Sequence, residues 1–195
     1  MALVTSPEGE VRRAWMRMVQ GDLAGGEAIL RDASATGPSA AVQLARFLLA
    51  GGRTDEGVTV LERASVRFPA DEAVRDLLAV AWARMGKQSE AEALYLGALA
   101  ARPGDAGALM GLGRVLVIEG RVQDGLDRMK RVSSDWPRNT GARQEYALTL
   151  YSLGRATEAL AELDAAARSR PAYREHLAAL ATSIQDAIEH TQPDN

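Results

Sequence analysis

The sequence predicts an all-α protein, an α-solenoid of helix-turn-helix repeats closed by a C-terminal capping helix. Its composition is rich in alanine, leucine and arginine and only 5% aromatic, which favours helices over strands. A period of 34 residues runs along the chain, marked by Gly52, Gly86, Gly120 and Gly154 and by Pro69, Pro103, Pro137 and Pro171. A fixed period of this length indicates a solenoid of stacked supersecondary units.

The unit 72–105 defines the repeat. Read at helical spacing, it contains two amphipathic segments on either side of Gly86. The first segment places Leu78, Ala79 and Trp82 on one face. The second places Ala91, Leu94, Tyr95 and Ala98 on one face. Two such helices can bury their apolar faces only against each other and against the neighbouring units.

The remaining elements follow from the same pattern. The opening pair, helices at about 8–20 and 24–34, is a repeat trimmed by three residues, because Gly21 and Gly52 are 31 apart. We expect one domain over 7–189, with flexible ends at 1–6 and 190–195. The predicted units are 7–37, 38–71, 72–105, 106–139 and 140–173, followed by a capping helix at 174–189.

The residues between helices have local physical roles. Glycine adopts the left-handed conformation that ends a helix without a Cβ clash, so the periodic glycines should be C-terminal caps. Asp71, Asp105 and Asn139 follow the prolines by two residues and should be N-caps. Small residues recur once in each first helix, at Ala45, Ala79, Gly113 and Ala147. They predict tight contacts with the paired helix.

Composition and charge narrow the function classes. The chain has no cysteine, which excludes disulfides and thiolate metal sites. A formal net charge of −3 argues against broad attraction to nucleic acid or to anionic membranes. No apolar run approaches the about 20 residues of a membrane span. The first ten residues lack the basic and apolar regions of a secretory signal, so we expect a cytoplasmic protein.

At these positions the chain resembles the tetratricopeptide repeat (TPR) family. The matching pattern begins with Leu or Tyr followed by Ala or Gly at 44–45, 78–79, 112–113 and 146–147. It continues with the turn glycine, a small residue at 57, 91, 125 and 159, and the closing proline. The resemblance implies a right-handed superhelix whose first helices line a concave groove. It also implies a non-catalytic scaffold or adaptor for protein partners.

Carrying the family geometry onto this chain predicts which side chains face the groove. They are Val42, Arg46, Asp76, Val80, Met110, Arg114, Val117, Gln144, Leu148 and Tyr151. We interpret the apolar members as a track for a partner peptide or helix. Arg46 and Arg114 would anchor its carboxylates. The opposing interpretation is that such grooves always expose some apolar surface and that the arginines are only solvated. A chaperone-type carboxylate clamp is not expected, because Val42, Asp76 and Val80 occupy positions that it needs polar or basic.

The first helix leaves two interpretations open for Trp15. In the register of the other units it faces the groove with Val11 and Met18. Shifted by one residue it lies in the core, which we favour because a stripe at helical spacing usually packs. A second functional class follows from the trimmed first unit: Val11, Trp15 and Met18 would bind another copy of the chain. A third class, an RNA-binding helical repeat, is disfavoured by the acidic charge balance and the few groove lysines.

No set of residues predicts catalysis, a cofactor or a metal. His176 is isolated, and Ser133 has no nearby histidine to activate it. The Gly111-x-Gly113 pair follows no strand and lacks a further glycine at the spacing of a phosphate loop. We therefore expect no enzyme activity, no cofactor and no metal site.

Overall fold

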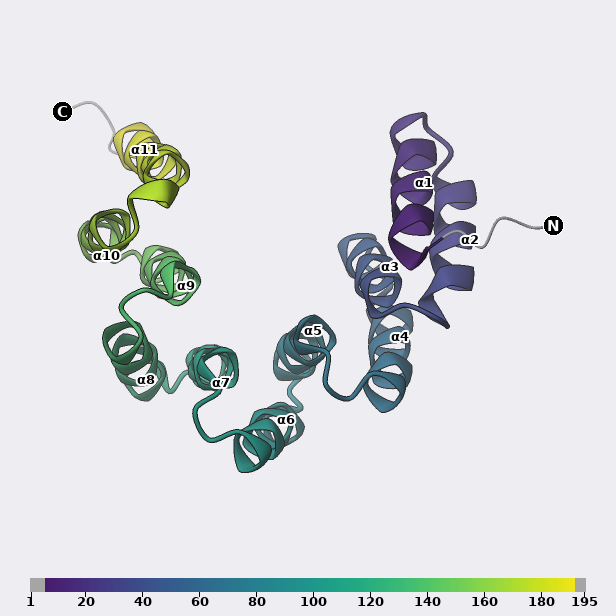
Figure 1. The fold of residues 1–195 in the computed structure, drawn as a ribbon, viewed down its shortest axis with the longest axis horizontal. Coiled ribbons are helices and arrows are strands. Elements are labelled where there is room, and N and C mark those ends of the chain that lie inside the picture. Colours follow the sequence, from purple (N-terminus) through teal and green to yellow (C-terminus); the bar gives the residue numbers. More distant parts are fainter. Residues whose placement is uncertain (1–5, 192–195) are drawn as a thin grey trace. The chain divides into compact units, whose positions relative to one another are not determined.

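The computed structural model describes residues 6–191, with side chains described as far as residue 186. All regular structure in this part of the chain is helical. Figure 1 shows the helices in chain order. Their bounds are α1 Pro7–Val19, α2 Leu23–Ser34, α3 Pro38–Ala50, α4 Thr54–Arg67, α5 Glu72–Arg84, α6 Gln88–Ala101, α7 Ala106–Ile118, α8 Val122–Asp135, α9 Thr140–Ser152, α10 Ala156–Ser169 and α11 Arg174–Thr191, with a 3-10 turn at Pro171–Tyr173. The predicted all-α repeat fold is confirmed.

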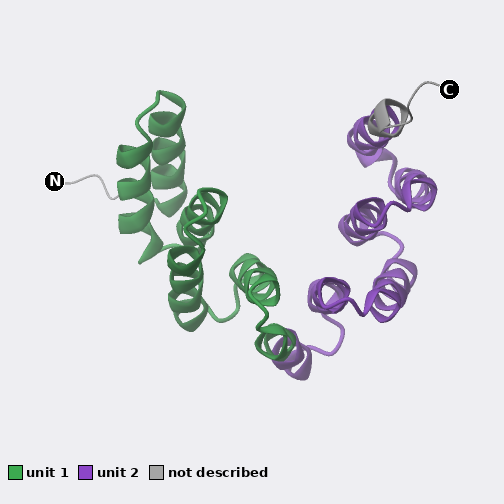
Figure 2. Ribbon diagram, turned by 180° about the vertical axis from the view of Figure 1, so that it is seen from behind, with its two compact units in different colours: residues 1–94 green, residues 95–195 purple. Residues whose placement is uncertain are grey.

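The helices group into two compact units, coloured separately in Figure 2. Unit 1 covers 1–94 and unit 2 covers 95–195, so the division falls within α6. In unit 1, α1, α3 and α5 contact one another in succession, and α2 and α4 pack beside them. In unit 2, α7 contacts α9, α8 and α10 pack beside them, and α11 closes against α10. Each unit is therefore a double row of antiparallel helices (Figure 1).

The turn glycines adopt the predicted left-handed conformation. Gly52, Gly86, Gly120 and Gly154 have φ between 76° and 84°, and Gly21 has φ 90°. After each glycine the next amide donates back across the helix end. The amide of Arg121, for example, donates to the carbonyl of Leu116 at 2.9 Å. This is the Schellman arrangement, which satisfies carbonyls that the helix end would otherwise leave unpaired.

The first helices begin at the predicted N-caps. Asp71, Asp105 and Asn139 accept hydrogen bonds from the amides three residues ahead, at 2.9, 3.0 and 3.1 Å. The second helices α4, α8 and α10 begin differently, after an arginine whose side chain offers no cap. Instead, Arg53 pairs with Glu56 at 2.7 Å and Arg155 with Glu158 at 2.6 Å. Each pair holds an acid in the first turn, where the helix dipole favours negative charge.

The positions predicted for tight helix pairing are buried. Ala45, Ala79 and Ala147 have no exposed surface. The core is a series of apolar clusters along each unit, built mainly from leucine and alanine. The fold thus holds each helix pair close together.

The chain ends differ slightly from the prediction. Most of the segments expected to be flexible, 1–5 and 192–195, lie outside the described residues. The prediction includes Ser6 in the flexible N-terminus, but its hydroxyl oxygen accepts from the amide of Gly9 at 3.2 Å and caps α1. At the other end, residues 190 and 191 belong to α11.

Candidate partner-binding surfaces

In unit 2, the predicted groove residues lie on the adjacent helices α7 and α9. Leu148 is 41% exposed. Val117, Gln144 and Tyr151 are half-buried, so each presents part of its side chain to solvent. Val117 and Tyr151 also pack against the core of unit 2, which fixes their orientation. These four residues are accessible members of the predicted site in unit 2, and we call them the α7–α9 face.

The side chain of Arg114 interacts with other side chains of the protein. Its guanidinium pairs with the carboxylate of Glu145 on α9 and donates to the hydroxyl of Tyr95 at 3.2 Å. The bridge joins α7 to α9, because the two partners lie on neighbouring first helices. Arg114 therefore positions the α7–α9 face, whereas the sequence interpretation made it a free anchor for a partner's carboxylate.

Two predicted groove residues are not accessible. Val42 is 5% exposed and belongs to a core cluster with Ala64 and Val74. Met110 is 2% exposed and belongs to the core of unit 2 with Leu126 and Met129. Their inclusion in the site is corrected: neighbouring helices cover them, and they stabilise the repeat instead of contacting a partner.

The remaining predicted residues belong to unit 1. Arg46 on α3 is exposed, and Val80 on α5 is half-buried. Asp76 is also half-buried and pairs with Arg75 of the same helix at 3.3 Å. The helices α3 and α5 contact each other, so these side chains belong to the same row of unit 1.

The prediction that Trp15 lies in the core is wrong. Trp15 is 45% exposed, because α2 packs against α1 on the side of Ala14 and Met18. Met18 is buried and Val11 is half-buried against the same cluster, so neither forms an exposed self-association surface with Trp15. The exposed large apolar residues of α1 are instead Trp15, Met16 and Val19, and they line one shallow depression. We call these three residues the α1 patch.

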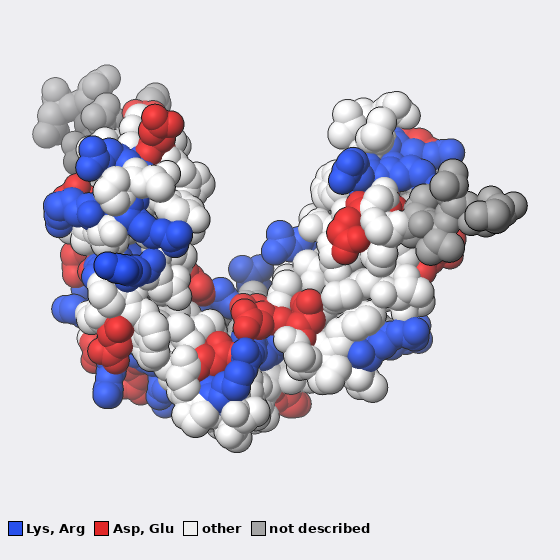
Figure 3. Space-filling view, in the orientation of Figure 1, with Lys and Arg blue, Asp and Glu red and all other residues white. Residues whose placement is uncertain are grey.

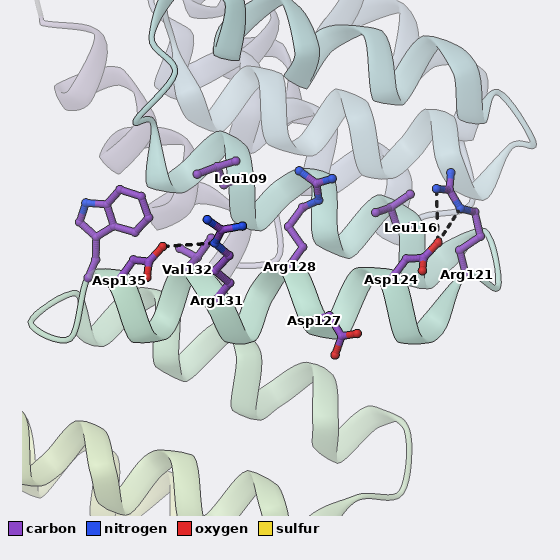
Figure 4. Close-up of a pocket in the computed structure, with 10 residues that line it drawn as sticks. Leu109, Leu116, Arg121, Asp124, Asp127, Arg128, Arg131, Val132 and Asp135 are labelled. Atoms are coloured by element: carbon purple, nitrogen blue, oxygen red, sulfur yellow. Dashed lines mark hydrogen bonds and ion pairs between the residues drawn. The ribbon is translucent and has the colours of Figure 1, made fainter.

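A crevice between α7 and α8 was not anticipated from the sequence. It has a volume of about 640 Å³, and Leu109, Val132 and Trp136 supply apolar lining. Figure 4 shows charged side chains of α8 around it. Arg121 pairs with Asp124 at 3.4 Å and Arg131 with Asp135 at 3.6 Å. Most of the charge at this crevice is therefore neutralised within the protein.

The remaining candidate residues were a possible metal cluster, Ser133 and His176. Among residues with described side chains, no three His, Cys, Asp or Glu groups cluster as metal ligands would. Ser133 is buried and donates to the carbonyl of Lys130 at 2.8 Å, and His176 is exposed. Within the part of the chain that the structure describes, no helix combines the length and apolar character of a bilayer span.

On the face seen in Figure 3, charge does not mark a single binding area. Side chains of both signs are interspersed over the face seen in Figure 3, with uncharged surface between them. This mixture agrees with the small formal net charge of −3.

Comparisons with known proteins agree with this architecture. Sequence profiles of the tetratricopeptide repeat match residues 18–81 and 116–184, and a second profile of that repeat matches 77–131. A crystal structure of TTC0263, a thermophilic TPR protein in Thermus thermophilus, superposes with a TM-score of 0.63 at 20% identity. The match covers 92% of this chain and 99% of that one.

MamA 41-end from Desulfovibrio magneticus RS-1 superposes with a TM-score of 0.51 at 15% identity, over 86% of this chain and 97% of that one. At these identities the two structures support the fold alone. Among curated protein sequences, none matches this chain. The repeat profiles cover more than half of the chain, and the chain belongs to the tetratricopeptide repeat family.

Proposed function

We propose that this protein is a non-catalytic scaffold that binds a peptide or helix of a partner protein on its α7–α9 face. The tetratricopeptide repeat fold generally mediates protein–protein interaction, and its members are typically non-catalytic. The proposal adds a location and a mode of binding to that general role. The cytoplasmic location expected from the sequence, and the expected lack of nucleic-acid binding, stay predictions.

The exposure of Leu148 is the observation that carries this proposal. A leucine that is 41% exposed leaves apolar surface in water, and a partner would remove that surface from water on binding. Tyr151 and Val117 lie on the same pair of helices and are held by the core, so they are ordered before binding. A few residues contribute most of the binding energy in protein interfaces, and tyrosine is among the types enriched there, so Tyr151 would be the main anchor beside Leu148.

The bridge between Arg114 and Glu145 adds orientation to the face. It crosses from α7 to α9 and holds the two helices in one register. Both side chains are partly exposed, so a partner can still hydrogen-bond to the outer atoms of the pair. Arg46 belongs to unit 1 and is exposed there, so its binding of a carboxylate would be separate from the α7–α9 face.

Peptide selection followed by affinity measurement tests this proposal. Peptides selected on the wild-type protein from a random phage-displayed library are synthesised, and their Kd values are measured for wild type and variants. We expect Leu148→Glu to weaken binding about tenfold or more, the loss of an interface anchor. Leu96→Glu is the matched control, because Leu96 is 52% exposed on the second helix α6.

Circular dichroism of both variants should match wild type, since both leucines are already solvent-exposed. The α7–α9 face would be refuted as the binding site if Leu96→Glu weakened peptide binding as much as Leu148→Glu does. It would also be refuted if Leu148→Glu bound the peptides as tightly as wild type does.

A second candidate function, self-association, is favoured by the α1 patch. Trp15, Met16 and Val19 are 45%, 59% and 85% exposed and adjoin one another on α1. A contiguous apolar patch of this kind is typical of an interface. Light scattering across a range of concentrations should then show dimers for wild type. The double variant Trp15→Ser with Val19→Ser should remain monomeric. The control variant Leu96→Ser should form dimers as wild type does. A monomeric wild type at every concentration would exclude this function.

A further inference from the structure

A second crevice, in unit 1, lies on the outer side of the helix rows. Side chains of α2 and α4 form its walls, and the buried Leu44 of α3 lies at its base. Its volume is about 730 Å³, within the size range of known ligand sites. Val60, Ala64 and Val66 of α4 add apolar surface, and Val66 is exposed. The crevice can therefore accept an apolar side chain.

The charged residues that line this crevice are all arginines: Arg31, Arg63 and Arg67. Arg31 is neutralised, because it pairs with Glu27 at 2.6 Å and with Glu56 at 2.9 Å. Arg63 and Arg67 are both exposed, and they make no ion pair or hydrogen bond with any other described side chain. They are four residues apart on α4, so they project from the same side of the helix. The crevice thus carries two uncompensated positive charges.

The crevice between α7 and α8 provides an internal comparison. Two repeats later, 68 residues along the chain, Arg131 corresponds to Arg63 and Asp135 to Arg67. There the i,i+4 pair is an arginine with an aspartate, and the two side chains form an ion pair (Figure 4). In unit 1 an arginine stands where the aspartate would be, and like charges at this spacing destabilise a helix. A ligand with negative charge would relieve that repulsion.

We propose that the crevice between α2 and α4 binds an acidic segment of a partner protein that carries an apolar side chain. The apolar side chain would enter the crevice above Leu44 and beside Val60. Carboxylates next to it would pair with the guanidinium groups of Arg63 and Arg67, which match their geometry. This site lies on α2 and α4, so it is distinct from the α7–α9 face. The two proposals can therefore be tested independently.

Fluorescence anisotropy with a designed peptide tests the proposal. The probe is a short fluorescein-labelled helical peptide with two leucines one turn apart, flanked by glutamates. We expect saturable binding to wild type that weakens as salt is added, because opposite charges are screened. Replacing the leucines by serine should weaken binding, since the crevice would lose its apolar contact.

The variants Arg63→Glu with Arg67→Glu, and the milder Arg63→Gln with Arg67→Gln, should each weaken binding by about tenfold or more. Arg128→Glu with Arg138→Glu is the control. These arginines are also exposed, and changing them to glutamate alters the net charge of the protein as much as the first variant does. All three proteins should show wild-type circular dichroism, because every substituted side chain is on the surface.

Three results would overturn the proposal. The first is an acidic peptide that does not bind wild type saturably. The second is equal loss of binding in the Arg128 and Arg138 control. The third is tighter binding of a single-stranded RNA oligonucleotide than of the peptide, which would assign the two arginines to phosphate binding.

Discussion

Gly125 of α8 lies directly against the backbone of Gly113 of α7. A Cβ atom on Gly125 would be 2.5 Å from the carbonyl oxygen of Gly113, closer than such contacts occur in proteins. A Cβ atom on Gly113 would likewise be 3.0 Å from the carbonyl oxygen of Gly125. The two glycines therefore set how closely the helices of the fourth repeat approach.

We predict that Gly125→Ala destabilises the protein by about 1–3 kcal/mol, because the added methyl group overpacks the contact with Gly113. The free energy of unfolding would be measured by urea denaturation. Gly97→Ala is the control. Gly97 lies inside α6 with nothing within 4 Å of an added Cβ. Its replacement should stabilise by about 0.5–1 kcal/mol through helix propensity. If both variants are stabilised, the helix pair is looser than described.

We predict that Gly120→Val costs about 1–2 kcal/mol, since φ at Gly120 is 84° and a β-branched residue is strained there. Thermal or urea unfolding would measure the loss. Gly120→Asn should cost less, because asparagine tolerates the left-handed conformation better than valine does. Equal stability of the two variants would show that the turn does not need a left-handed residue.

We predict an acid-sensitive contribution from Glu56. Hydrogen bonds from Arg53 and then from Arg31 lower the pKa of Glu56 from 4.5 to about 2. A carboxyl with a lowered pKa in the folded state contributes stability that is present above pH 4.5 and is lost as the pH falls toward about 2. The urea midpoint of wild type should therefore fall over this window more steeply than that of Glu56→Gln.

Asp55→Asn is the control for this experiment, because Asp55 is a neighbouring acid in the first turn of α4. Glu56→Gln should change the pH profile more than Asp55→Asn does, because Glu56 forms ion pairs with both Arg31 and Arg53. If Glu56→Gln has the same pH profile as wild type, the network that joins Arg31, Arg53, Glu27 and Glu56 does not form in solution.

Features that depend on a few neighbouring residues were predictable. The left-handed glycines and the N-caps at Asp71, Asp105 and Asn139 each act within one turn of chain, so their identity and spacing sufficed. The period of 34 residues then predicted which helices pair. The small residues at 79 and 147 predicted where the paired helices touch. Residue pairs far apart in the sequence were not predictable in this way. Arg114 and Glu145 are 31 residues apart, and their bridge exists only because α7 and α9 lie side by side.

By itself, the sequence determined the repeat fold, the helix ends and the family, because these follow from local conformational preference and from a period. Tertiary structure alone decided which apolar residues are exposed. Trp15 and Met18 lie on the same predicted stripe, yet α2 covers Met18 and leaves Trp15 in solvent. Val42 and Met110 are likewise covered by neighbouring helices, whereas Leu148 is not. Burial depends on which helix packs on which side, and a stripe at helical spacing does not contain that information.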